Sequence, residues 1–239
     1  MVLSNIHADW RPILEKALKT LSPTYISELE SSSAWLPGKE KIFNAFRLPK
    51  EKTRYILLGE SPYPRAESAN GYAFWDNAVS NIWDGHRGLS KAVNRATSLR
   101  NWIKMLLHAN GALIGDFSQQ AIAELDKSSW IQTLDDLFQN LLDEGFLLLN
   151  ASLVLSERSV QKDVSAWRPF MASLLSQLAD ERREITVILL GLKAQPIAPL
   201  CHAPLECFSA EHPYQLSFIT NPNVVDFFKP FDLLRLRKK

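Results

Sequence analysis

Polar side chains able to bind or catalyse follow the short apolar runs of the chain. Glu60 and Ser61 come directly after the run at 55–59, and Asn150 ends the run at 146–150. The set is completed by Gln195, His212 and the aromatic residues Tyr63 and Phe74. An amide, an imidazole and aromatic rings suit a flat heterocycle, because rings stack on its face while polar groups hydrogen-bond to its edge. These residue types therefore predict a site for a flat heterocycle.

Four apolar runs of strand length are the elements that must position these side chains. They cover residues 55–59, 146–150, 187–191 and 205–209. Apolar residues at helical spacing predict helices within 98–111, 130–145 and 165–184. Strands that alternate with helices predict an α/β fold with a central four-stranded, mostly parallel, twisted sheet flanked by helices. In such a sheet ligands bind beyond the carboxyl ends of the strands, where these polar residues stand.

Three sequence signals mark further helices and helix ends. Apolar residues recur at helical spacing between Trp10 and Leu21, which predicts an amphipathic helix and not a targeting segment. Asn110 and Gly111 form a C-terminal helix signal. Pro222 stands at an expected first helical position.

Length and composition favour one large domain over residues 1–239. Hydrophobic residues make up 46% and charged residues 22% of the chain, and its net charge is +1. A DNA-binding surface is therefore expected to be a local patch. Cys201 and Cys207 are expected to be reduced thiols, which predicts a cytoplasmic protein. No apolar run has transmembrane length, so no association with a membrane is expected. No Cys/His cluster has metal-ligand spacing, so no metal is expected.

Several stretches resemble motifs of the uracil-DNA glycosylases, most closely those of family 1 of that superfamily. GESPYPR at 59–65 is similar to the family's water-activating GQDPYHG, and the match continues without a gap through 66–74. The further matches, in the family's order, are SLRN at 98–101, LLLN at 147–150, VILLGLKAQ at 187–195 and HPYQLS at 212–217. The resemblance implies the superfamily's three-layer α/β/α fold in a single domain.

The resemblance implies three uracil-binding residues. Phe74 would stack on the flipped-out uracil, and Asn150 would hydrogen-bond the uracil edge and reject cytosine. Tyr63 would fill the space where thymine carries its methyl group. Taken alone, Phe74 is typical of a core residue and Asn150 of a structural turn. Their places in an ordered series of matches favour the site.

The resemblance assigns catalysis and DNA contact to other matched residues. His212 would donate a hydrogen bond to uracil O2 as negative charge grows there, and Leu216 would enter the gap left in the base stack. Ser98 and Ser217 would bind DNA phosphates. Such a hydrolysis needs no cofactor, and the expected partner is uracil-containing DNA, single- or double-stranded, bound by a monomer.

The main departure from the family follows residue 59, where Glu60 and Ser61 replace a glutamine and the catalytic aspartate. The aspartate orients water at the sugar C1′, and its charge stabilises an oxocarbenium-like transition state. Serine can hold water but brings no charge. Losing that charge costs about 4 kcal/mol, on the order of a thousandfold in rate. Glu60 either supplies the missing carboxylate or is a loop carboxylate that accepts backbone N–H bonds.

Basic residues bear on DNA binding. Arg65 stands where the family has glycine, and it either clashes with DNA or binds a phosphate. Further basic residues bracket the expected helix start near Ser98, where a helix N-terminus favours phosphate. They are Arg87, Lys91, Arg95, Arg100 and Lys104. The sequence predicts no role for residues 76–97.

Three functions are compatible with these residues. The first is a DNA repair glycosylase that flips uracil out of DNA and hydrolyses its N-glycosidic bond, with activity reduced or altered by Ser61. The second is a uracil- or damaged-DNA-binding protein with a glycosylase fold and little catalysis. The third is a glycosylase for another base, which Asn150 and Tyr63 argue against.

Overall fold

The computed structural model describes residue 3, residues 5–192 and residues 194–237, and these fall into two compact units. Unit 1 comprises residues 1–77 and 145–209, and unit 2 comprises residues 78–144 and 210–239. Each unit therefore combines two segments that are distant in the sequence.

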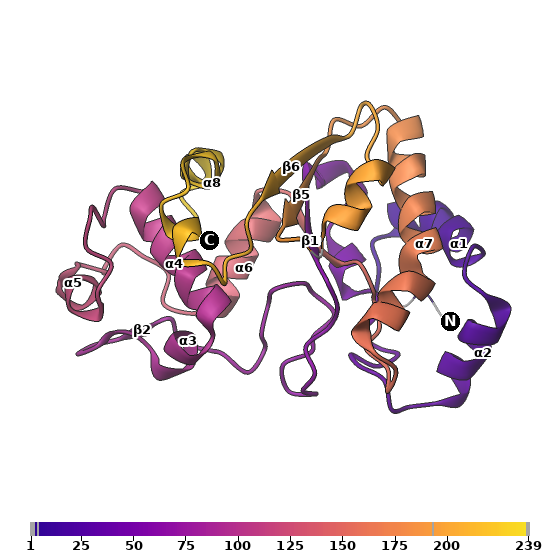
Figure 1. The fold of residues 1–239 in the computed structure, drawn as a ribbon, viewed down its shortest axis with the longest axis horizontal. Coiled ribbons are helices and arrows are strands. Elements are labelled where there is room, and N and C mark those ends of the chain that lie inside the picture. The colour runs from indigo at the N-terminus through magenta and orange to yellow at the C-terminus, as the bar shows by residue number, and fades with distance from the viewer. Residues whose placement is uncertain (1–2, 4, 193, 238–239) are drawn as a thin grey trace. The chain divides into compact units, whose positions relative to one another are not determined.

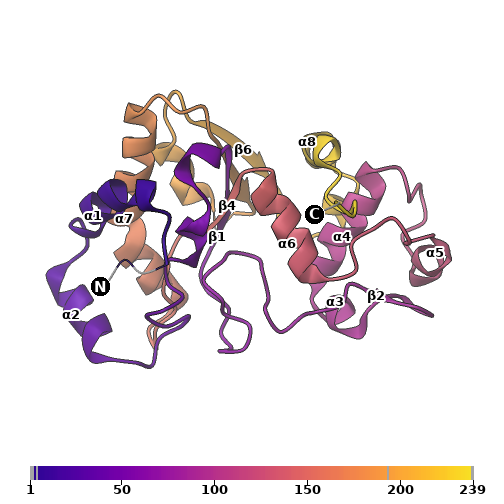
Figure 2. The ribbon, with the colours of Figure 1, turned by 180° about the vertical axis from the view of Figure 1, so that it is seen from behind.

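Unit 1 is built on a four-stranded sheet with strand order β4-β1-β5-β6. Figure 1 labels β1, β5 and β6, and Figure 2 labels β4 beside β1. The strands are β1 (Tyr55–Gly59), β4 (Phe146–Asn150), β5 (Thr186–Leu190) and β6 (Glu206–Ala210). β1 pairs in parallel with both β4 and β5, so these three strands end at the same edge of the sheet. The first two strands have the predicted bounds, and the last two each lie one residue from the predicted range.

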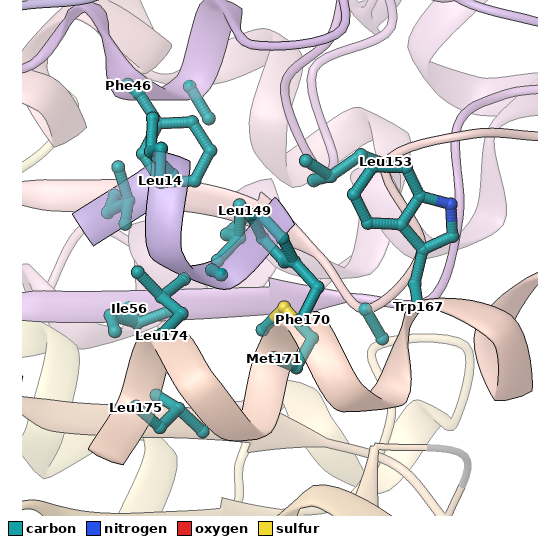
Figure 3. Close-up of a cluster of buried hydrophobic side chains, with 14 of the residues drawn as sticks. Leu14, Phe46, Ile56, Leu149, Leu153, Trp167, Phe170, Met171, Leu174 and Leu175 are labelled. Atoms are coloured by element: carbon teal, nitrogen blue, oxygen red, sulfur yellow. The ribbon is translucent and has the colours of Figure 1, made fainter. Parts of the chain in front are cut away.

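The main hydrophobic core covers one face of this sheet. Ile56 and Leu58 belong to it, while Leu57 between them is buried on the opposite side, as the two-residue period of a strand requires. Figure 3 shows Ile56 and Leu149 from the sheet against Trp167, Phe170 and Leu174. Burial of each large apolar side chain contributes about 1.5–3 kcal/mol. This core fixes the strands whose ends carry the predicted site residues.

Three helices accompany the sheet in unit 1. They are α1 (Arg11–Leu18), α2 (Pro23–Ser31) and α7 (Val160–Asp180). α1 and α7 pack against each other, and Figure 2 shows them side by side. α7 begins five residues before the predicted 165, because its first turns bury a carboxylate and not an apolar side chain. Asp163 is fully buried there and accepts hydrogen bonds from Tyr25 Oη at 3.0 Å and from the Ser156 backbone N–H at 2.8 Å.

Unit 2 consists mainly of helices. They are α3 (Lys91–Arg95), α4 (Thr97–Ala109), α5 (Gln119–Glu124), α6 (Leu134–Asp143) and α8 (Pro222–Phe228). The signals at Asn110–Gly111 and Pro222 are confirmed: Asn110 caps α4, Gly111 adopts φ +83°, and Pro222 opens α8.

Residues 76–97, for which the sequence predicts no role, contain α3 and a short antiparallel hairpin. Its strands are β2 (Trp83–Asp84) and β3 (Gly88–Leu89). The Trp83 indole donates to the Ile131 carbonyl at 2.7 Å, and Gln119 Oε1 accepts the Leu89 backbone N–H at 3.1 Å. The hairpin is therefore tied to other parts of unit 2 by hydrogen bonds.

The structure also contains short 3₁₀ helices. They are η1 (Ala8–Trp10), η2 (Asn44–Arg47), η3 (Lys50–Lys52), η4 (Gln195–Leu200), η5 (Leu216–Ile219) and η6 (Lys229–Phe231). Within the described ranges, every helix is too short or too polar to cross a lipid bilayer.

Candidate active site

The ends of β1 and β4 bring together the predicted site residues that follow them, Glu60 and Ser61 after β1 and Asn150 at the end of β4. Gly59 and Asn150 are register partners at the carboxyl ends of the two parallel strands. The pairing continues beyond the strands, because the Ala151 N–H donates to the Gly59 carbonyl at 2.8 Å and the Ser152 N–H to the Glu60 carbonyl at 3.0 Å. Glu60 and Ser61 are both half-buried in the loop that starts there.

Asn150 is a buried carboxamide held close against a glycine. Its side chain is 4% exposed, and a Cβ added to Gly59 would overlap the Asn150 side-chain oxygen. The close approach of these two strand ends therefore requires glycine at position 59. Among the residues that the structure describes, the carboxamide has no hydrogen-bond partner. An amide offers both a donor and an acceptor, which suits the edge of a ligand that carries the complementary pair.

The segment that carries Phe74 runs beside β4. The Ala73 N–H donates to the Leu148 carbonyl at 3.1 Å, two residues before Asn150. Phe74 itself is half-buried and adopts φ +63°, a left-handed conformation that is rare for a bulky residue. Such strained residues cluster at functional sites. The structure thus places Phe74 near the strand end that carries Asn150.

Tyr63 ties the two loop segments together. Its hydroxyl donates to the Phe74 carbonyl at 3.1 Å. Burial raises the pKa of the Tyr63 phenol, and the negative charge of Asp76 raises it further. The phenol therefore keeps its proton, and the donor role, well into the alkaline range.

Arg65 lies in an ion pair within the same loop. Its guanidinium is 3.4 Å from the buried carboxylate of Asp76 and 3.8 Å from the exposed carboxylate of Glu67. The Arg65 side chain is 59% exposed, so its outer face stays open to solvent. The predicted contact of Arg65 with a phosphate stays a prediction, and the structure adds a second role in bracing the loop.

His212 follows β6 and belongs to unit 2. Its Nδ1 accepts the backbone N–H of Tyr214 at 3.1 Å. A ring nitrogen that accepts carries no proton, so in the neutral ring the proton is assigned to Nε2. The imidazole is half-buried, and its donation to a uracil, which the resemblance implies, stays a prediction.

Asn101 in α4 holds the loop that follows His212, and the sequence analysis did not single it out. Its Nδ2 lies 2.8 Å from the Pro213 carbonyl, 3.3 Å from that of Tyr214 and 3.5 Å from that of Gln215. Asn101 is fully buried, and its Oδ1 has no hydrogen-bond partner within the described residues. The sequence signal that covers it is the SLRN match at 98–101, whose last residue is Asn101.

The predicted DNA-binding residues of unit 2 lie on two elements that pack together. Ser98 is the second residue of α4, and Leu216 and Ser217 open η5, which packs against α4. The Trp102 and Phe218 rings contribute to this packing, with centroids 6.3 Å apart. Leu216 is 72% exposed, and the Ser217 hydroxyl donates to the Glu211 carboxylate.

Two further predictions concern Gln195, a member of the predicted polar set, and metal binding. The side chain of Gln195 lies outside the described part of the chain. No group of three or more His, Cys, Asp and Glu residues able to hold a metal ion occurs among the described residues.

Comparison with known proteins supports the expected family. The model of the uracil DNA glycosylase superfamily matches residues 46–232. A curated uracil-DNA glycosylase of Amoebophilus asiaticus is 26% identical over 198 residues, which cover 80% of this chain and 76% of that protein.

Two solved structures are similar to this one to different degrees. The wild-type UNG of Nitratifractor salsuginis is 40% identical, with a TM-score of 0.91 over 98% of this chain and 94% of that one. The uracil-DNA glycosylase of mimivirus is 16% identical, with a TM-score of 0.58 over 87% of this chain and 70% of that one, which speaks for the fold alone. The predicted α/β fold is confirmed. The chain belongs to the uracil DNA glycosylase superfamily.

Proposed function

We propose that this protein removes uracil from DNA by hydrolysing the N-glycosidic bond, which leaves an abasic site. The observation that carries the proposal is the buried Asn150 carboxamide, which lacks a partner among the described residues and lies close to Phe74 along β4. A carboxamide can pair with both a carbonyl and an N–H of the uracil edge. Cytosine presents an amino group instead, so a site built for uracil leaves polar groups unpaired and rejects it. Tyr63 would exclude thymine by occupying the space of its methyl group.

His212 would stabilise the leaving uracil. The proton assigned to Nε2 would be donated to uracil O2 as the glycosidic bond breaks and negative charge develops on the base. The sugar would gain positive charge in a dissociative transition state. Neither step calls for a metal ion or an organic cofactor.

The water side of the reaction is where this chain would be weaker than its family. Ser61 would hold the attacking water through its hydroxyl without stabilising the positive sugar. Glu60 is the carboxylate next to Ser61 in the chain, and its backbone carbonyl accepts the Ser152 N–H. We propose that the water is held at Ser61 and that excision is slower than with an aspartate by up to about a thousandfold.

Unit 2 would supply contacts to the DNA backbone. Ser98 lies in the first turn of α4, where unpaired N–H groups and the helix dipole favour a phosphate. Arg100 and Lys104 stand on the same helix, and burial together with the Arg100 charge lowers the pKa of Lys104. Two cations held near each other gain from a nearby anion. We further predict that the protein is a monomer and that residues 1–239 form a single domain. We also predict that it acts in the cytoplasm, on single- or double-stranded DNA.

Ser61 also favours a second candidate function, a protein that binds uracil-containing DNA with little catalysis. The two functions differ in whether the bound base is released. A labelled oligonucleotide with one uracil, single-stranded or paired with G or A, is incubated with the protein and then treated with alkali to break abasic sites. The control is the double variant Asn150→Ala, His212→Ala, which tests for contaminating host enzyme.

The proposed enzyme cleaves this substrate, and the double variant does not. Equal cleavage by both preparations would contradict the proposal. Absence of cleavage at high enzyme concentration, with binding to the uracil oligonucleotide retained, would establish the DNA-binding protein instead.

A further inference from the structure

Two exposed apolar side chains stand close together after His212. Five large apolar side chains are exposed within the described ranges, and two of them, Tyr214 at 64% and Leu216 at 72%, are two residues apart. Scattered exposed apolar residues are ordinary, whereas neighbouring ones mark interaction sites. Of these two exposed residues, the resemblance assigns a DNA contact only to Leu216, and it gives no role to the aromatic ring of Tyr214.

The loop that carries Tyr214 is held rigid. Asn101 donates to the carbonyls of residues 213–215, and the Gln215 N–H donates to the His212 carbonyl at 2.9 Å. At the far end, Glu211 accepts the Ser217 hydroxyl and the Asn221 amide, the latter at 2.9 Å. A ring on a preorganised loop loses little entropy when it binds a partner.

The Tyr214 side chain has no structural task within its own unit. Its ring makes no aromatic contact and its hydroxyl no hydrogen bond with the described residues. The bonds at this position come from the backbone, whose N–H reaches His212 and whose carbonyl reaches Asn101. Replacing the side chain therefore leaves the contacts that orient His212 in place.

We propose that Tyr214 is a second DNA-contacting residue, whose ring stacks on a nucleobase that flanks the excised one. The inference rests on the proposed function, because that function brings DNA to the His212 loop. Two residues of chain span at most about 7 Å, and less in the turn that the Gln215 N–H closes on the His212 carbonyl, while successive bases on one strand are about 3.4 Å apart. Tyr214 therefore reaches a base one or two steps from the gap that Leu216 enters. Every nucleobase has a face for stacking, so the contact would be tolerant of sequence.

Binding to an oligonucleotide with one tetrahydrofuran abasic-site analogue tests the inference, because this probe needs no cleavage. A 2-aminopurine placed beside the analogue reports stacking through its fluorescence. Stacking of one base on an aromatic residue is worth about 1–3 kcal/mol, so Tyr214→Ser should weaken binding about 5- to 150-fold and change the fluorescence. Tyr214→Phe keeps the ring and should bind within about threefold of the wild type.

The matched control is Ile114→Ser, which removes an apolar side chain of unit 2 that is 83% exposed but lies outside the loop. This control should leave affinity and fluorescence unchanged. Unchanged binding by Tyr214→Ser, or equal losses in the Phe and Ser variants, would overturn the stacking contact. Uracil cleavage by the wild type is measured in parallel. If the wild type cleaves uracil DNA and Tyr214→Ser binds the analogue normally, this inference alone is refuted. If Tyr214→Ser binds more weakly but the wild type does not cleave, the proposed function alone is refuted.

Discussion

The loop after β1 and the loop after β6 both carry predicted catalytic residues, but they are held in different ways. The first is tied within itself, by Tyr63 to the Phe74 carbonyl and by Arg65 to Asp76. The second depends on a residue outside it, Asn101, which reaches three of its carbonyls from α4.

This difference bears on how each loop can vary. A loop braced by its own side chains can exchange residues if the braces change with them. By the resemblance, we expect Ser61 and Arg65 of the first loop to be such exchanges. The second loop depends on the buried Asn101 amide of α4, which donates to three of its backbone carbonyls. Replacing this one residue therefore leaves several carbonyls unpaired. We therefore expect activity to fall more when Asn101, which supports the second loop, is replaced than when Tyr63 or Arg65 of the first loop is replaced.

Asn150→Ala should give the largest loss. It removes the amide that we assign to the uracil edge, and loss of one preorganised polar group typically costs about a hundredfold to a thousandfold in rate. Single-turnover excision of uracil from an oligonucleotide measures the effect, and thermal melting monitors the fold. A loss below tenfold would refute the uracil-binding role of Asn150.

Asn101→Ala should lower excision about tenfold or more, because the loop carrying His212 loses its support. Asn140→Ala is the matched control: this asparagine of α6 is also buried, and its Nδ2 donates to the Leu233 carbonyl at 2.8 Å and the Arg235 carbonyl at 3.0 Å. Both variants leave carbonyls unpaired and should lose about 1–3 kcal/mol of stability. Only Asn101→Ala should change kcat, and equal kcat losses in both would mean that Asn101 has no special role.

Tyr63→Phe should have a smaller effect, since it removes one hydrogen bond to the Phe74 carbonyl. The expected loss of unfolding free energy at neutral pH is about 1 kcal/mol. Because the folded state raises the pKa of this phenol above its ordinary value near 10, wild-type stability falls as pH rises above 10. The difference between wild type and variant should therefore shrink above pH 10 in denaturant titrations. A constant difference would show that the phenol is not shielded.

Arg65→Met should have the smallest effect. The pair with Asp76 is half exposed on the arginine side, and exposed ion pairs contribute about 0–1 kcal/mol. If Arg65 also binds a phosphate, the slope of log affinity against log salt should fall by about one unit. Asp76→Asn serves as the comparison, because it breaks the brace and keeps the cation. Equal salt slopes in wild type and Arg65→Met would leave the brace as the role of Arg65.

The strands and the family motifs were predictable from the sequence because they are local. Residues 146–150 are continuously apolar until Asn150, which marks their strand, whereas the register that brings Asn150 beside Gly59 is seen only in the structure. Asn101 ends the SLRN match, but its support of the His212 loop was not predictable, because that loop is more than 100 residues away in the chain. The start of α7 was missed for a related reason: the buried Asp163 looks like a surface residue until Tyr25 and Ser156 are placed beside it.

The most direct test of the account concerns Glu60 and Ser61. Single-turnover excision of uracil is measured for the wild type, Glu60→Gln, Ser61→Ala and Ser61→Asp. We predict that Ser61→Asp raises the rate, by up to about a thousandfold, because it restores a charge beside the developing oxocarbenium ion. Glu60→Gln should then have little effect. A wild type as fast as Ser61→Asp, with activity abolished in Glu60→Gln, would contradict the account and assign the catalytic carboxylate to Glu60.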